Sequence, residues 1–230
     1  MNRRELLLTI IGGADGPTAV FVAGEFGMGF LLFVAAVLLL AAILIFWRPG
    51  VRTKYRFLRL SVGNLLIHLM DGLITFVNTP DLAMEGNPLV SRWGLGWGAL
   101  FTANLIGFIL IVLAAWYFNR YEYERIPSKG VFDYYMKLFY GEDYRPRWFW
   151  YKPSKNYRAM AALLSYSLYW GLTAAAPYFV IDWMLHMYQA RPWWWPNKWG
   201  AILFAVLVAY GCAYCWVRAG YRQSAGKAEE

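Results

Sequence analysis

Long apolar runs alternate with shorter polar segments along this chain, and this pattern predicts helices that cross a membrane. The clearest run covers residues 28–47 and contains no charged side chain. A helix needs about 20 apolar residues to cross a hydrocarbon core that is roughly 30 Å thick. The runs that we interpret as spans cover residues 5–24, 26–47, 57–78, 95–118, 159–184 and 200–217.

The composition agrees with this pattern. Apolar residues make up 60% of the 230 residues, aromatic residues 20% and charged residues only 16%. These proportions exclude an ordinary water-soluble domain and indicate an integral membrane protein. We therefore predict an all-α fold with about six transmembrane helices, in which residues 1–230 form a single domain within the lipid bilayer.

The distribution of charge predicts how the spans are oriented. Residues 48–59 carry five basic side chains and no acid, whereas residues 79–93 carry Asp81, Glu85 and only Arg92. Because basic loops stay on the cytoplasmic side, both termini are expected in the cytoplasm. The membrane is expected to be the inner membrane of a bacterium. The net charge of +8 is spread over these loops, so no nucleic-acid partner is predicted.

Two polar segments between the spans have predicted structure of their own. Residues 119–158 are rich in aromatic and basic side chains and are expected on the cytoplasmic side. Within them, residues 131–140 predict a short helix that lies on the membrane or on a partner. On the opposite side, Glu85, Asn87 and Pro88 are expected to cap a helix near the outer surface.

The first span is interrupted near its middle. Its central residues are Gly12, Gly13, Asp15, Gly16, Pro17 and Thr18. An acid within a membrane is costly, which makes Asp15 a functional candidate. The glycines and Pro17 predict a break in the helix, and the freed backbone groups could bind an ion. A broken helix that serves only packing is the alternative.

This interrupted segment resembles a known family. The sequence from Gly12 to Thr18, with its flanking residues, is similar to the motif of the beta subunit of sodium-translocating decarboxylases. In that family the aspartate lies in a broken helix and helps to bind sodium. The resemblance implies that Asp15 is a sodium ligand, that Na⁺ is the bound ion, and that the residues around Asp15 form the break.

The third span carries a second group of polar side chains. Ser61, Asn64, His68, Asp71 and Thr75 are spaced by three, four, three and four residues, which places them on one helical face. A polar face of a membrane helix must point into the protein, so this stripe is the expected neighbour of Asp15. Hydrogen bonds between helices would explain the same pattern, above all for Ser61, Asn64 and Thr75.

A third group joins two of these residues to the fifth span. His68 and Asp71 on one helix and Asp182 and His186 on another are all expected in the outer half of the membrane. Each pair is spaced for one helical face, and two histidines with two carboxylates could bind zinc or iron. The alternative is that His186 lies at the interface and that Asp182 pairs with a basic residue.

Three classes of function therefore remain open. The first is a membrane protein that binds or translocates a cation, with Asp15 and the stripe of the third span as ligands. The second is an accessory or assembly subunit of a larger membrane complex, or a homo-oligomer, which docks through residues 119–158. The third is a metal-dependent membrane enzyme that uses His68, Asp71, Asp182 and His186.

Overall fold

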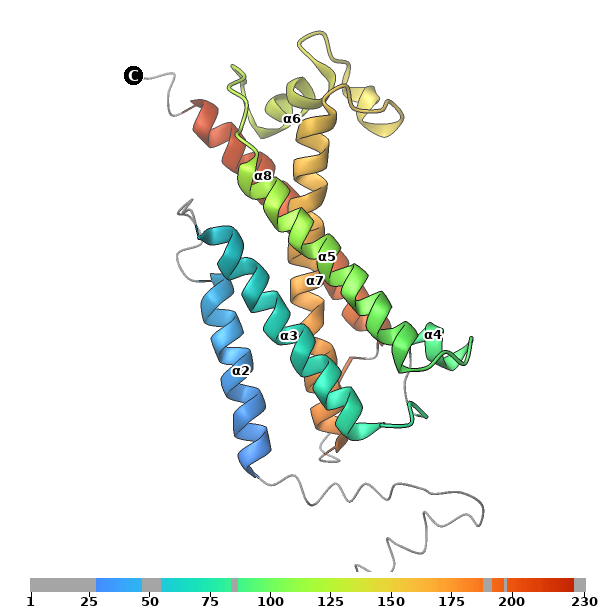
Figure 1. Ribbon diagram of the computed structural model, residues 1–230. Helices are drawn as coiled ribbons and strands as arrows, with labels where there is room; N and C mark the ends of the chain where they lie inside the picture. Colours follow the sequence, from blue (N-terminus) through green and yellow to red (C-terminus); the bar gives the residue numbers. More distant parts are fainter. Residues whose placement is uncertain (1–27, 47–54, 84–86, 188–191, 197, 226–230) are drawn as a thin grey trace, which may run out of the picture.

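The computed structural model describes residues 28–46, 55–83, 87–187, 192–196 and 198–225. Within these ranges every regular element is a helix, which confirms the predicted all-α class. The five helices that are long and apolar enough to cross a membrane are α2 (Met28–Phe46), α3 (Arg56–Asn78), α5 (Trp97–Arg120), α7 (Tyr157–Met187) and α8 (Lys198–Ala225) (Figure 1). The first predicted span, residues 5–24, lies outside the described residues.

The outer surface of these helices is suited to lipid. In α2, for example, Leu32 and Leu39 are 61% and 62% exposed although the helix is apolar on every side. A helix that is apolar all round is stable when lipid or protein surrounds it. The exposed apolar surface therefore places the described helices in a bilayer.

The helices alternate in direction, and the bundle that they form has two distinct ends. One end, which we call the α6 end, contains the end of α5, helix α6 (Val131–Tyr140) and the beginning of α7 (Figure 1). The opposite end, the α4 end, contains the end of α3, the short helix α4 (Pro88–Ser91) and the beginning of α5. Asn87 caps α4 as expected, since its side-chain oxygen accepts a hydrogen bond of 3.0 Å from the amide of Leu89.

Small residues bring neighbouring helices into close contact. A β-carbon added at Gly63 of α3 would lie 2.5 Å from Ile45 Cγ1 and 3.1 Å from the carbonyl oxygen of Ala41, both in α2. One added at Gly171 of α7 would lie 3.0 Å from Ala209 Cβ of α8. Lipid does not drive apolar helices together, so such close packing is one of the means that holds membrane helices in place.

Helix α6 has the predicted bounds but not the predicted position. Its apolar side does not face the membrane, because Tyr134, Met136, Leu138, Phe139 and Tyr140 are buried within the protein. Helices α7 and α8 and the segment that follows α5 provide the other side of this cluster. A 3₁₀ helix, Pro146–Trp150, follows α6 and had no counterpart in the sequence pattern.

Helix α8 extends further than the predicted span, which ended at residue 217. The change from apolar residues to Arg218 and Arg222 predicts where α8 leaves the membrane, but the helix continues to Ala225. The hydroxyl of Ser224 accepts a hydrogen bond from the amide of Ile126 (2.9 Å) and donates one to its carbonyl (2.8 Å). These contacts hold the last turns of α8 against the α6 end.

Candidate functional site

A cavity of about 1180 Å³ lies between α3, α5 and α7, with a smaller contribution from α8 and from the segment before α5. It is found in the half of the bundle nearer to the α4 end. Its polar lining residues are His68, Asp71, Thr75, Asn87, Arg92, Asn104 and Asp182. Aromatic side chains form much of the remaining wall, namely Trp97, Phe101, Phe108, Phe179, Trp183 and Trp199.

Helix α3 supplies the first side of the cavity from part of the predicted stripe. Leu60, Ile67 and Ile74 recur every seven residues and are buried in the core. This apolar side fixes the rotation of α3, and as a result His68, Asp71 and Thr75 line the cavity. Ser61 and Asn64 lie one or two turns further toward the α6 end, away from the cavity.

His68 is half buried in the wall between α3 and α5. Its ring meets the ring of Phe108 of α5 edge to face, with a centroid distance of 6.2 Å. The Nε2 atom is buried and has no hydrogen-bond partner within the part of the chain that the structure describes. A buried imidazole nitrogen of this kind can accept or donate a hydrogen bond to a bound molecule.

The carboxylates of Asp71 and Asp182 reach the same cavity from two different helices. Asp71 belongs to α3 and Asp182 to α7, and both side chains are half buried. The third helix, α5, adds the amide of Asn104, which also donates a hydrogen bond of 3.1 Å to the carbonyl of Leu100. The structure thus brings together three of the four residues of the predicted metal group, His68, Asp71 and Asp182, and adds Thr75 of the stripe to the same cavity.

Asn64 belongs to a different polar cluster, between α3 and α7. It is fully buried, and its Nδ2 atom donates to the hydroxyl of Tyr169 at 2.8 Å and to that of Thr173 at 3.0 Å. The Tyr169 hydroxyl donates in turn to the carbonyl of Leu60 at 3.2 Å. For Asn64, the structure therefore shows the alternative explanation of the polar stripe, which was hydrogen bonding between helices.

The predicted zinc or iron centre can be compared only in part. His68, Asp71 and Asp182 line one cavity. Among the described residues, however, no three His, Cys, Asp or Glu side chains are grouped closely enough to hold a metal ion. His186 lies in α7, but its side chain is outside the described part of the chain.

The N-terminal segment cannot be placed against this cavity. Gly12, Gly13, Asp15, Gly16 and Thr18 all lie outside the described residues. Their predicted role as a sodium site therefore stays a prediction.

Three polar residues of the cavity were missing from the sequence-based site, and one of them, Asn87, was expected only as a helix cap. Asn104 is the single strongly polar side chain between Thr102 and Asn119 of α5, and this isolation within an apolar span was the available signal. Arg92 lies in the segment that joins α4 to α5, where its position along the chain gave no indication of a site. Comparisons with protein-family models, with curated proteins and with solved structures find no match to this chain.

Proposed function

We propose that this integral membrane protein binds a cation in the cavity between α3, α5 and α7. The observation that carries the proposal is that His68 and Asp71 of α3 and Asp182 of α7 line one cavity. An acidic side chain within the membrane costs free energy, and such residues commonly belong to paths or binding sites for ions. A cation between two carboxylates from different helices would offset that cost.

The remaining lining residues favour the same class of ligand. Arg92 is the one basic lining side chain among the described residues, and it is exposed near the α4 end. Aromatic side chains form much of the rest of the wall, and aromatic faces attract cations. Oxygen ligands for an ion are available from Thr75 and Asn104 in addition to the carboxylates.

Sodium is the first cation to test, because the segment from Gly12 to Thr18 resembles a sodium-binding element. In this proposal Asp15 either completes the cavity or forms a second site. The orientation belongs to the proposal as well: residues 119–158 carry nine basic and five acidic side chains, which favours a cytoplasmic α6 end and cytoplasmic termini.

The test is the thermal stability of the purified chain in detergent, with sodium, potassium or N-methylglucamine at constant ionic strength. A ligand that binds only the folded state raises stability, by about 2.7 kcal/mol at a concentration of 100 Kd. We expect sodium to raise Tm above the other two cations. Asp71→Asn and Asp182→Asn should remove this increase, whereas Asp143→Asn, an exposed acid at the α6 end, should keep it.

The outcomes separate the possible sites. If Asp15→Asn alone removes the response, the ion binds at the N-terminal segment and the cavity proposal is wrong. If none of the three cations changes Tm, the function as a cation-binding protein is contradicted. Isolation of the chain with a stoichiometric protein partner would instead support a subunit of a larger complex.

A further inference from the structure

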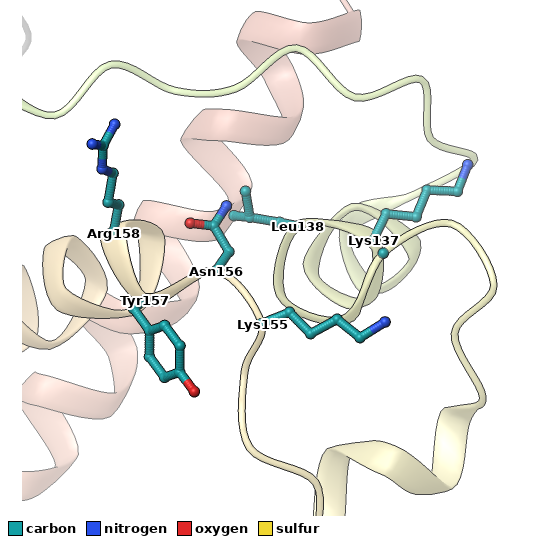
Figure 2. A pocket seen from close by; sticks show the side chains of 7 residues that line it. Lys137, Leu138, Lys155, Asn156, Tyr157 and Arg158 are labelled. Atoms are coloured by element: carbon teal, nitrogen blue, oxygen red, sulfur yellow. The ribbon is translucent and has the colours of Figure 1, made fainter.

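The α6 end contains a second pocket, of about 520 Å³, at the beginning of α7. Its polar lining residues are Lys137, Lys155, Asn156, Tyr157 and Arg158. Figure 2 shows Lys155 and Arg158 extending to opposite sides of this pocket, with Asn156 between them. The pocket is therefore broad and basic, unlike the aromatic, acidic cavity at the other end.

The position of this pocket along α7 indicates its level relative to the membrane. Tyr157 begins α7, and the stretch from Tyr157 to Leu185 is apolar enough to span a bilayer. Lys155 and Arg158 therefore lie where α7 enters the membrane, at the level of the lipid headgroups. Basic and aromatic side chains are typical of that level.

Two of the three cations in the pocket are available to a ligand. Lys137 is engaged, because its Nζ atom lies 3.6 Å from Asp133 and 3.9 Å from Glu142 and donates a hydrogen bond to the carbonyl of Pro127. Lys155 and Arg158 are exposed, and neither forms an ion pair with an acid among the described residues. Lys155 lies near the ring of Trp148, with Nζ 5.9 Å from the ring centre.

The backbone that carries these side chains is held in place. The amide of Lys155 donates to the carbonyl of Phe139 at 2.8 Å, and the Ser154 hydroxyl donates to the same oxygen at 3.3 Å. Asn156 caps α7 by accepting from the amide of Ala159 at 3.0 Å, while its Nδ2 atom donates to Glu124 at 2.8 Å. Binding would therefore require ordering of the basic side chains but not of this segment.

An apolar surface continues from the pocket along α7 into the membrane. Tyr157, Leu164, Leu168 and Leu172 follow one another by seven, four and four residues, which places them on one face of the helix. All four are exposed, from 74% at Tyr157 to 40% at Leu172. A molecule that suits both features has an anionic head and a hydrocarbon tail.

We propose that this pocket binds the phosphate of an anionic phospholipid, whose acyl chains lie along the exposed face of α7. The Lys155 and Arg158 side chains, which extend to opposite sides of the pocket, would turn toward a phosphate that lies between them. The acyl chains would contact Leu164 and Leu168. A free phosphate ion has the same head chemistry, but it would make no use of the apolar face. This inference does not require a cation in the cavity, although the apolar face of α7 ends at Leu172, which lines that cavity.

The test uses the full chain in detergent with an equimolar mixture of phosphatidylglycerol and phosphatidylcholine, and it counts bound lipids by native mass spectrometry. We expect the chain to retain phosphatidylglycerol preferentially. The double variant Lys155→Gln, Arg158→Gln should lose this preference by roughly fivefold for each charge removed. Arg145→Gln, Arg147→Gln removes the same charge from exposed residues of the same end that do not line the pocket.

Each result decides the proposal. Equal loss of preference in both double variants would show attraction by the whole basic surface and would overturn the assignment to this pocket. Equal retention of the two lipids by the unchanged protein would also overturn it. If inorganic phosphate, added with no further lipid, displaces all the bound phosphatidylglycerol, the site is one for free phosphate. Lys155→Arg, Arg158→Lys, which keeps both charges, should retain the preference and shows that the segment tolerates substitution.

Discussion

The two ends of this molecule treat their polar groups in opposite ways. In the packed interior of the α6 end, polar side chains are joined to backbone and to one another, as with Tyr134, whose hydroxyl donates to the carbonyl of Glu124 at 3.0 Å. At the α4 end, His68, Asp71 and Asp182 line a hollow instead. The first arrangement stabilises a fold, and the second leaves polar groups facing a space that a ligand could occupy.

The tyrosines of the α6 end show how complete its packing is. Burial raises the pKa of the Tyr134 hydroxyl well above its ordinary value, and the nearby Glu124 carboxylate raises it further. Burial likewise raises the pKa of Tyr135 to about 12. Both side chains therefore stay neutral across the physiological range and act as packing residues with one polar tip. This comparison predicts that substitutions at the α6 end outside its basic pocket mainly change stability and that those at the cavity mainly change ligand binding.

The largest expected effect is that of Gly220→Leu, at the α6 end. A β-carbon at this position would lie 2.7 Å from the Tyr134 hydroxyl and 2.8 Å from Tyr123 Cδ1. Tyr134 is fully buried and cannot move aside without displacing α6. We expect the free energy of unfolding, measured by denaturation in mixed micelles, to fall by about 3 kcal/mol.

Gly211→Leu is the matched control for this prediction, because it lies on the same helix with no atom within 4 Å of an added β-carbon. It should leave the free energy of unfolding nearly unchanged. Equal losses in the two variants would show that any side chain larger than glycine weakens α8, and that the contact with α6 is not the cause.

A smaller effect is expected for Asn64→Ala, which lies between the two ends. The substitution removes hydrogen bonds to Tyr169 and Thr173 and leaves both hydroxyls buried. Polar contacts between membrane helices are worth about 1 kcal/mol, so a loss of about 1–2 kcal/mol in unfolding free energy follows. The increase in Tm caused by sodium should persist, because Asn64 does not line the cavity. Loss of that response in Asn64→Ala would place Asn64 in the cation site after all.

The sequence was informative wherever the membrane limits the choice of structure. Apolar length predicted the bounds of α2, α3 and α5 to within two residues, because helices are the structures that satisfy their backbone inside lipid. It could not predict that α6 is buried, since an apolar helix face fits a membrane surface as well as the ends of α7 and α8. Spacing along α3 could not separate Asn64 from His68 either, because their roles depend on which neighbouring helix each one faces.

The third expected effect concerns pH at the α6 end. The amide of Lys129 donates to Asp133 at 2.8 Å and is the main reason why the pKa of this carboxyl lies below its usual value of 3.8; the Tyr144 hydroxyl (2.9 Å) and Lys137 add to this. A lowered pKa means that the stabilisation is complete above the pKa of the unfolded chain. It is lost as pH falls through the lower pKa of the folded state.

The expected result is therefore a Tm difference between the unchanged protein and Asp133→Asn that is present at neutral pH and disappears in acid. The corresponding difference in the free energy of unfolding should not exceed about 1 kcal/mol, because the side chain is close to solvent. Thermal denaturation in detergent over a pH series measures it, and a difference that does not change with pH would contradict the assignment to Asp133.

Gly107→Phe is expected to have the smallest effect on stability. Its main effect should be on the binding of sodium. Gly107 of α5 lines the cavity and has no atom within 4 Å of an added β-carbon, so the new ring can enter the hollow without displacing a neighbour. Unfolding in the absence of sodium should change little, while the stabilisation by sodium should be reduced or lost. Gly98→Phe is the matched control, since Gly98 lies nine residues earlier, on the opposite face of the same helix, with equally open surroundings. If both variants keep the full response to sodium, the ion does not bind in this part of the cavity, and the contrast between a packed α6 end and a ligand-binding hollow is no longer supported there.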